Sequence, residues 1–61
     1  MQDTAQDVII YDKETEQFIT SFKYVTDLQS KVLGKHLFEK GYKVKIFNNR
    51  TGEVLYSMGF Q

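Results

Sequence analysis

The segment that decides the fold runs from residue 42 to residue 58 and reads YKVKIFNNRTGEVLYSM. Apolar and polar side chains alternate through YKVKIF, as they do in strands that bury one face. NNRTGE has the composition of a turn, and Gly52 supplies the positive φ that a type I turn followed by a bulge requires. With VLYSMGF as the returning strand, the sequence predicts a β-hairpin over residues 42–60.

A similar hairpin is predicted over residues 8–24. VIIYD and FITSFKY are rich in β-branched and aromatic residues, and Asp12 between them can accept backbone N–H groups in an Asx turn. Residues 8–22 align without gaps on residues 44–58, with identities at Val8/Val44, Ile10/Ile46, Thr15/Thr51 and Ser21/Ser57. Either an internal duplication or the ordinary likeness of two alternating hairpins explains this match.

One helix is predicted between the hairpins, over residues 27–40. The stretch from Thr26 to Gln29 fits a capping box, and Gly41 can adopt the left-handed conformation that ends a helix. At 100° per residue, one broad arc holds the apolar side chains that we expect to pack on the sheet, with His36 inside it: Leu28, Val32, Leu33 and Leu37. Gly34 and Phe38 are then expected on the outer side. We interpret His36 as structural, with a titrating switch or a base as the alternative.

These elements predict an α+β fold with ββαββ order. We expect a four-stranded, mainly antiparallel sheet with one helix packed on one face. We expect the second strand at one edge of this sheet, then the first, the third and, at the other edge, the fourth. Residues 1–7 are polar and without periodicity, which indicates a loose N-terminal tail before a single domain at 8–61.

Composition argues against several classes of protein. The chain has 61 residues, no cysteine and one histidine, so neither a disulfide framework nor a protein-only metal site is expected. It contains no nucleophile elbow and no glycine-rich phosphate loop, and we expect neither a cofactor nor an enzyme. No apolar run reaches the ~20 residues of a membrane helix, and the N-terminus lacks the pattern of a signal peptide. We therefore expect a soluble, cytoplasmic protein that does not bind membranes.

Alternation leaves more apolar side chains than one helix can cover. The face expected under the helix holds Val8, Ile10, Phe18, Thr20, Phe22, Tyr42, Val44, Ile46, Val54, Tyr56 and Met58. Five large apolar residues fall on the opposite face, which should otherwise be polar: Ile9, Tyr11, Ile19, Phe47 and Leu55. We expect these five to form a protein interface, because large exposed apolar patches on small proteins mark binding sites. The predicted function is a non-enzymatic accessory or regulatory interaction module, which forms a homodimer or docks on a larger protein.

Charge is distributed unevenly although the net charge is zero. Residues 1–30 hold six acids and two bases, a net of −4, and residues 31–61 hold six bases and two acids, a net of +4. The halves can neutralise each other, or the basic half can bind an acidic partner. The alternative function is therefore nucleic-acid binding, although the sequence contains no ribonucleoprotein motif, helix-turn-helix or zinc finger. Its candidate contacts are Lys31, Lys35, Lys43, Lys45 and Arg50.

Overall fold

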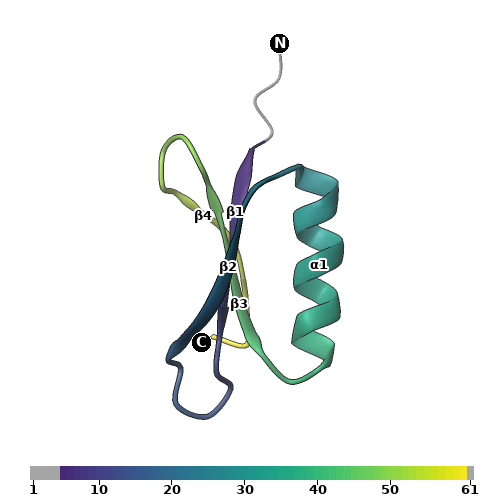
Figure 1. Cartoon of the computed structure of the whole chain (residues 1–61), viewed down its shortest axis with the longest axis vertical. Coiled ribbons are helices and arrows are strands. Elements are labelled where there is room, and N and C mark those ends of the chain that lie inside the picture. The colour runs from purple at the N-terminus through teal and green to yellow at the C-terminus, as the bar shows by residue number, and fades with distance from the viewer. Residues whose placement is uncertain (1–4, 61) are drawn as a thin grey trace.

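The computed structural model describes residues 5–60, and Figure 1 shows a twisted sheet with a helix along one face. In chain order, the elements are β1 (Gln6–Tyr11), β2 (Phe18–Val25), α1 (Asp27–Glu39), β3 (Lys43–Asn48) and β4 (Val54–Met58). All neighbouring strands are antiparallel and the strand order is β2-β1-β3-β4. The predicted α+β fold, element order and strand order are confirmed.

The first strand begins earlier than the sequence pattern indicated. β1 starts at Gln6, whose Cα is paired with Val25 on β2 and with Asn48 on β3. Two residues of the predicted tail therefore belong to the sheet, because Gln6 is paired on both sides and Asp7 is paired with Phe47 of β3. Residues 1–4 of that tail lie outside the described residues, as does residue 61.

The two hairpin turns have the same hydrogen-bond pattern. The Asp12 carboxylate accepts the N–H groups of Glu14 and Thr15 at 2.8 and 3.0 Å. The Asn48 side chain does the same at the equivalent positions, accepting the N–H groups of Arg50 and Thr51 at 2.8 and 3.1 Å. Glu16 and Gly52 close the two turns with positive φ, at 62° and 77°. The turn chemistry predicted around Asp12 and Gly52 is therefore present in the structure.

The helix begins at Asp27, as predicted, and ends at Glu39, one residue before the predicted end. Thr26 Oγ1 accepts the N–H of Gln29 at 3.2 Å, and the Gln29 side chain accepts the N–H of Thr26 at 3.3 Å, which completes the capping box. At the other end, Gly41 has φ 104° and donates its N–H to the carbonyl of Phe38. These caps satisfy backbone groups that the helix ends would leave unpaired.

The core is small and lies between α1 and the two central strands. Its fully buried side chains alternate along β1 and β3: Val8, Ile10, Val44 and Ile46. Partly buried side chains pack around them, namely Val25, Leu33, Leu37 and Met58. All four core residues belong to the face that was predicted to lie under the helix.

Candidate protein interface

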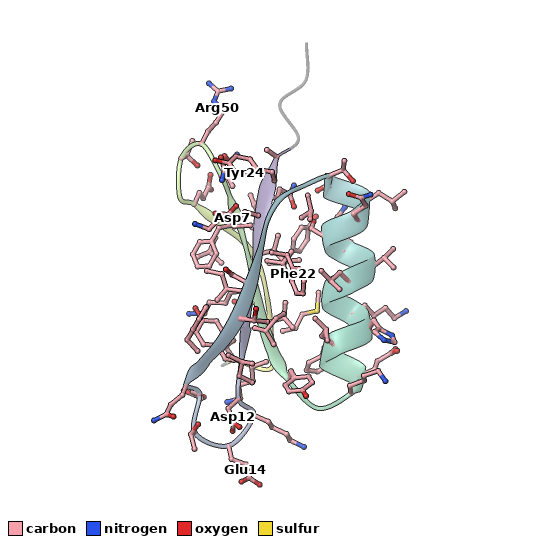
Figure 2. All side chains as sticks on the ribbon, viewed as in Figure 1. Asp7, Asp12, Glu14, Phe22, Tyr24 and Arg50 are labelled. Carbon is pink, nitrogen blue, oxygen red and sulfur yellow. The ribbon has the colours of Figure 1, made fainter. Side chains whose placement is uncertain are left out.

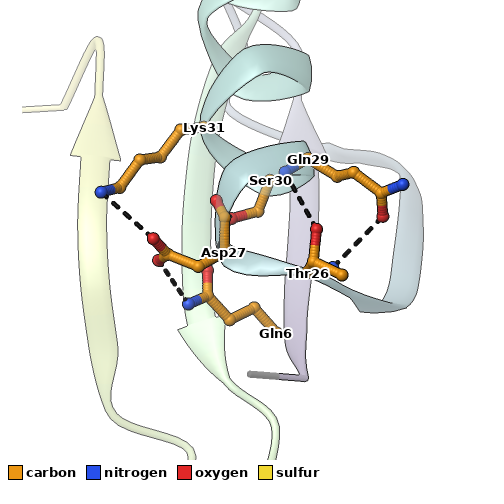
Figure 3. A network of polar contacts seen from close by, with 6 residues as sticks. All are labelled: Gln6, Thr26, Asp27, Gln29, Ser30 and Lys31. Atoms are coloured by element: carbon orange, nitrogen blue, oxygen red, sulfur yellow. Dashed lines mark hydrogen bonds and ion pairs between the residues drawn. The ribbon is translucent and has the colours of Figure 1, made fainter. Parts of the chain in front are cut away.

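A network of polar side chains sets which side of α1 faces the sheet (Figure 3). Ser30 is fully buried, and its hydroxyl donates to the side-chain oxygen of Gln6 at 2.6 Å. Gln6 in turn donates from its amide nitrogen to the Asp27 carboxylate at 2.8 Å. A buried hydroxyl and a nearly buried amide are costly unless paired, so these contacts favour this rotation of the helix.

Small residues occupy the side of α1 that meets the sheet. The buried residues of the helix are Ser30 and Gly34, which lie one turn apart. A Cβ at position 34 would lie 3.2 Å from Cδ1 of Ile46 and 3.3 Å from Cε of Met58. The expectation that Gly34 faces outward is therefore wrong: its missing side chain lets the helix approach β3 and β4 closely.

The predicted arc of apolar helix residues is only partly buried. Leu33 and Leu37 pack against the core as expected. Leu28 is 72% exposed and Val32 is 62% exposed, so the expectation that they pack on the sheet is wrong. They lie almost opposite Ser30 and Gly34 around the helix, because the buried side is occupied by the small residues.

His36 and Phe38 lie elsewhere on the helix than the sequence predicted. His36 is exposed rather than half-buried, because it lies well around the helix from the buried side marked by Ser30 and Gly34. Phe38 is exposed, as expected, but at the sheet side of the helix: a Cβ at Gly59 would lie 3.3 Å from its ring. It therefore folds over the helix edge toward the end of β4.

The helix leaves the edge strand β2 open. α1 packs over β3, β1 and β4, and Lys31 reaches the ring of Tyr56 on the β4 side. Phe22 projects from β2 to the helix-bearing side of the sheet and remains 42% exposed (Figure 2). On the flank of α1 away from β4, a shallow apolar hollow is lined by Leu28, Gln29, Val32, Leu33 and His36.

We call this region the α1–β2 surface. It consists of Phe22, Leu28, Val32, Leu33 and His36, none of which is Asp, Glu, Lys or Arg. Sequence reasoning placed Phe22, Leu28 and Val32 in the core, because their spacing fits a buried face. A signal that could have found them is the total of large apolar residues, which exceeds what a single layer of this size buries.

Charged groups are concentrated on the opposite flank of α1. Lys31 Nζ lies 3.2 Å from the Asp27 carboxylate and 5.2 Å from the centre of the Tyr56 ring. The Gln6 amide and then Lys31 lower the pKa of the Asp27 carboxyl. The hydrogen bond to Tyr56, followed by Asp27, raises the pKa of Lys31. The polar flank toward β4 thus contrasts with the apolar flank toward β2.

The five residues of the predicted interface lie on more than one part of the sheet. Ile9, Tyr11 and Phe47 are half-buried on the central strands, on the face away from α1. Ile19 and Leu55 are 46% and 36% exposed. They belong to β2 and β4, the strands at the two opposite edges of the sheet. The structure contains no partner, so their role as an interface stays a prediction.

The chain itself covers part of this face. The ring of Phe60 packs edge-on against Tyr11, with centroids 5.2 Å apart. Lys45 Nζ lies 4.6 Å from the Phe60 centroid and 5.8 Å from that of Tyr11, and Lys43 Nζ lies 5.3 Å from Phe60. These lysine stems and the C-terminal ring reduce the apolar area that this face exposes.

The five candidate nucleic-acid contacts are not on one surface. Lys43 and Lys45 lie on β3, on the face away from the helix, while Lys31 and Lys35 are exposed on α1. Arg50 is at the tip of the β3–β4 turn, at the opposite end of the molecule from Asp12 and Glu14 (Figure 2). The basic side chains of the second half of the sequence thus lie at three separate locations in the fold.

Several charges of the two halves also pair with each other. Lys43 contacts the Glu16 carboxylate, and Lys31 contacts Asp27, so both ion pairs join the acidic first half to the basic second half. The carboxylate of Asp12 accepts backbone N–H groups. The N–H of Thr15 and then that of Glu14 lower the pKa of this carboxyl. Within residues 5–60, no three His, Cys, Asp or Glu side chains are gathered as a metal site would need.

The architecture defines a small, two-layer α+β protein with an apolar surface beside one edge strand. Among the described residues, no helix is both long and apolar enough to cross a membrane. No protein-family model matches the chain, and no curated protein or solved structure shows significant similarity to it.

Proposed function

We propose that this protein is a non-enzymatic interaction module that acts by binding another protein chain through the α1–β2 surface. The observation that carries the proposal is the orientation of α1, which turns Ser30 and Gly34 toward the sheet and exposes Leu28 and Val32. A helix that buries its small residues and exposes its large ones has the arrangement expected if a second surface covers it.

The chemistry of the described side chains supports a binding role. The apolar hollow on α1 is shallow and lined by one polar amide and one imidazole among aliphatic groups. Enzyme sites usually place several polar groups convergently in a deeper pocket. Two of the three acids of the first turn are occupied as well, Asp12 by backbone N–H groups and Glu16 by Lys43.

The test uses the protein as bait in an extract of its native cells. Val32→Lys places a charge in the α1–β2 surface, whereas Leu55→Lys places the same charge on the opposite face of the sheet. We expect proteins captured by the wild type to be retained by Leu55→Lys and lost by Val32→Lys. Captured proteins that do not change with Val32→Lys, together with no self-association, would contradict the proposal.

Nucleic-acid binding is the second candidate, and one observation favours it. Tyr11 and Phe60 pack edge-on beside Lys43 and Lys45 on the face of the sheet away from α1, which combines aromatic rings with cations as single-strand-binding surfaces do. Binding of a fluorescent single-stranded oligonucleotide is measured at about 50 and 200 mM salt. Micromolar binding that weakens steeply with salt and is lost in Lys45→Gln would favour this candidate over the first.

A further inference from the structure

We propose that the partner at the α1–β2 surface is a second copy of this chain, packed face to face so that each α1 lies over the β2 strand of the other copy. The resulting dimer has two outer sheets with a pair of helices between them. This inference rests on the proposed function, since it names the occupant of the same surface.

The space beside α1 is wide enough for a second helix. β2 lies two strands from β3, which is about 10 Å at the usual spacing of strands. Helices pack against each other with axes about 8–10 Å apart. A second helix placed over β2 is therefore at the right distance to pack against the flank of α1 that carries Leu33 and His36.

The α1–β2 surface is complementary to itself. It presents an exposed apolar ridge, Leu28 and Val32, and also an uncovered strand with Phe22 pointing to the helix side. A twofold axis brings the ridge of each copy onto the open strand of the other. In this arrangement Leu28 and Val32 of one copy cover Phe22 of its partner, and the two helices meet along the apolar hollow.

The area of the α1–β2 surface fits a weak interface between two copies. With about 150–250 Å² for each large side chain, the exposed parts of Phe22, Leu28 and Val32 amount to roughly 300 Å² per chain. Two copies therefore contribute about 600 Å² from these side chains, and the rest of the hollow adds a smaller area, which places the interface at the low end of the size range, below about 1,200 Å². Lys35 and Glu39 are exposed and follow Leu28 and Val32 by seven positions on the same side of α1, so the apolar ridge is limited to the N-terminal half of the helix. Interfaces at this end of the range are typically weak, so we expect a dissociation constant in the micromolar range.

Sedimentation equilibrium from about 5 to 200 µM tests the dimer, because a micromolar dissociation constant falls within that range. We expect the wild type to change from a 7.2 kDa monomer to a dimer over this range. Val32→Lys should remain monomeric throughout, while Leu55→Lys should dimerise like the wild type. Both positions are exposed, so far-UV circular dichroism should show the fold retained in each variant.

A cross-linking experiment tests the geometry independently. The chain has no cysteine, so Val32→Cys and Phe22→Cys proteins can be mixed and treated with a short bis-maleimide. The proposal predicts a cross-linked heterodimer from this mixture and much less product when Ser57→Cys on β4 replaces Phe22→Cys.

Two results would overturn the proposed dimer or its surface. A wild type that stays monomeric to about 200 µM would overturn the second copy as the partner. A dimer that is disrupted by Leu55→Lys and unaffected by Val32→Lys would overturn the surface and favour the opposite face of the sheet. In either case the capture experiment with Val32→Lys still decides the proposed function, so the two failures are distinguishable.

Discussion

Gly34→Leu tests the packing of α1 directly, because the side chain would enter the closest contact between the helix and the sheet. The added Cβ would lie 3.2, 3.3 and 3.4 Å from side-chain carbons of Ile46, Met58 and Val44. Carbon atoms pack best at about 3.5–4.0 Å, so the first carbon already crowds three neighbours. The three further carbons of leucine have no space without moving the helix away from β3.

The expected cost is large relative to the stability of so small a domain. Overpacking a core costs about 1–3 kcal/mol, and 61 residues at the usual stability per residue give about 3–9 kcal/mol in total. We expect Gly34→Leu to lower the free energy of unfolding by about 2–3 kcal/mol and the melting temperature by roughly 10–20 °C.

Gly34→Ala separates crowding from helix propensity. Alanine gains about 1 kcal/mol over glycine within a helix, and the atoms it crowds first, Cδ1 of Ile46 and Cε of Met58, are flexible ends of side chains. We expect these effects to offset each other, so that stability changes by less than about 1 kcal/mol.

Urea unfolding followed by circular dichroism measures these changes, at one protein concentration since self-association would contribute to stability. Lys35→Leu is the matched control, because it adds the same side chain at the next, exposed helix position and should change stability by about 0.5 kcal/mol or less. If Gly34→Leu were tolerated as well as Lys35→Leu, and Gly34→Ala were stabilising by the full helix propensity, then Gly34 would not face the sheet.

Two further predictions concern the second turn and acid stability. Gly52 has φ 77°, so Gly52→Val should lower the free energy of unfolding by about 1–2 kcal/mol. Gly52→Asn should lower it by less than half as much, because asparagine tolerates this conformation. Equal melting temperatures for both variants would refute the turn assignment. The Gln6 hydrogen bond and Lys31 lower the pKa of Asp27 in the folded state, so its contribution to stability is present above the unfolded pKa of about 3.9 and is lost as the pH falls through the lower folded pKa. The melting temperature should therefore decrease on acidification below about pH 4, and Asp27→Asn should show a smaller decrease over the same range; an identical pH profile would mean that Asp27 is not stabilised by these contacts.

Local sequence signals were sufficient for the secondary structure. Thr26 and Gln29 form the cap that their spacing predicts, and Asp12 and Gly52 form the turns that their chemistry predicts. These features depend on hydrogen bonds between residues at most a few positions apart, so the sequence specifies them without knowledge of distant contacts. Alternation also put the four core residues of β1 and β3 on the face under the helix, but it assigned eleven residues to that face, of which most large side chains of the edge strands remain exposed.

The rotation of α1 about its axis was decided by the tertiary structure. Large apolar residues occur on several sides of this helix, so periodicity alone favoured the side with Leu28 and Val32, which the folded chain exposes. The side that packs on the sheet is marked by Ser30 and Gly34, which carry no hydrophobic signal. Ser30 is buried because Gln6, 24 positions earlier, supplies the acceptor for its hydroxyl. Gly34 is buried because Ile46 and Met58 fill the space that a side chain at this position would occupy. Such contacts exist only once the first strand, the helix and the second hairpin are assembled, and they are what leaves the α1–β2 surface open.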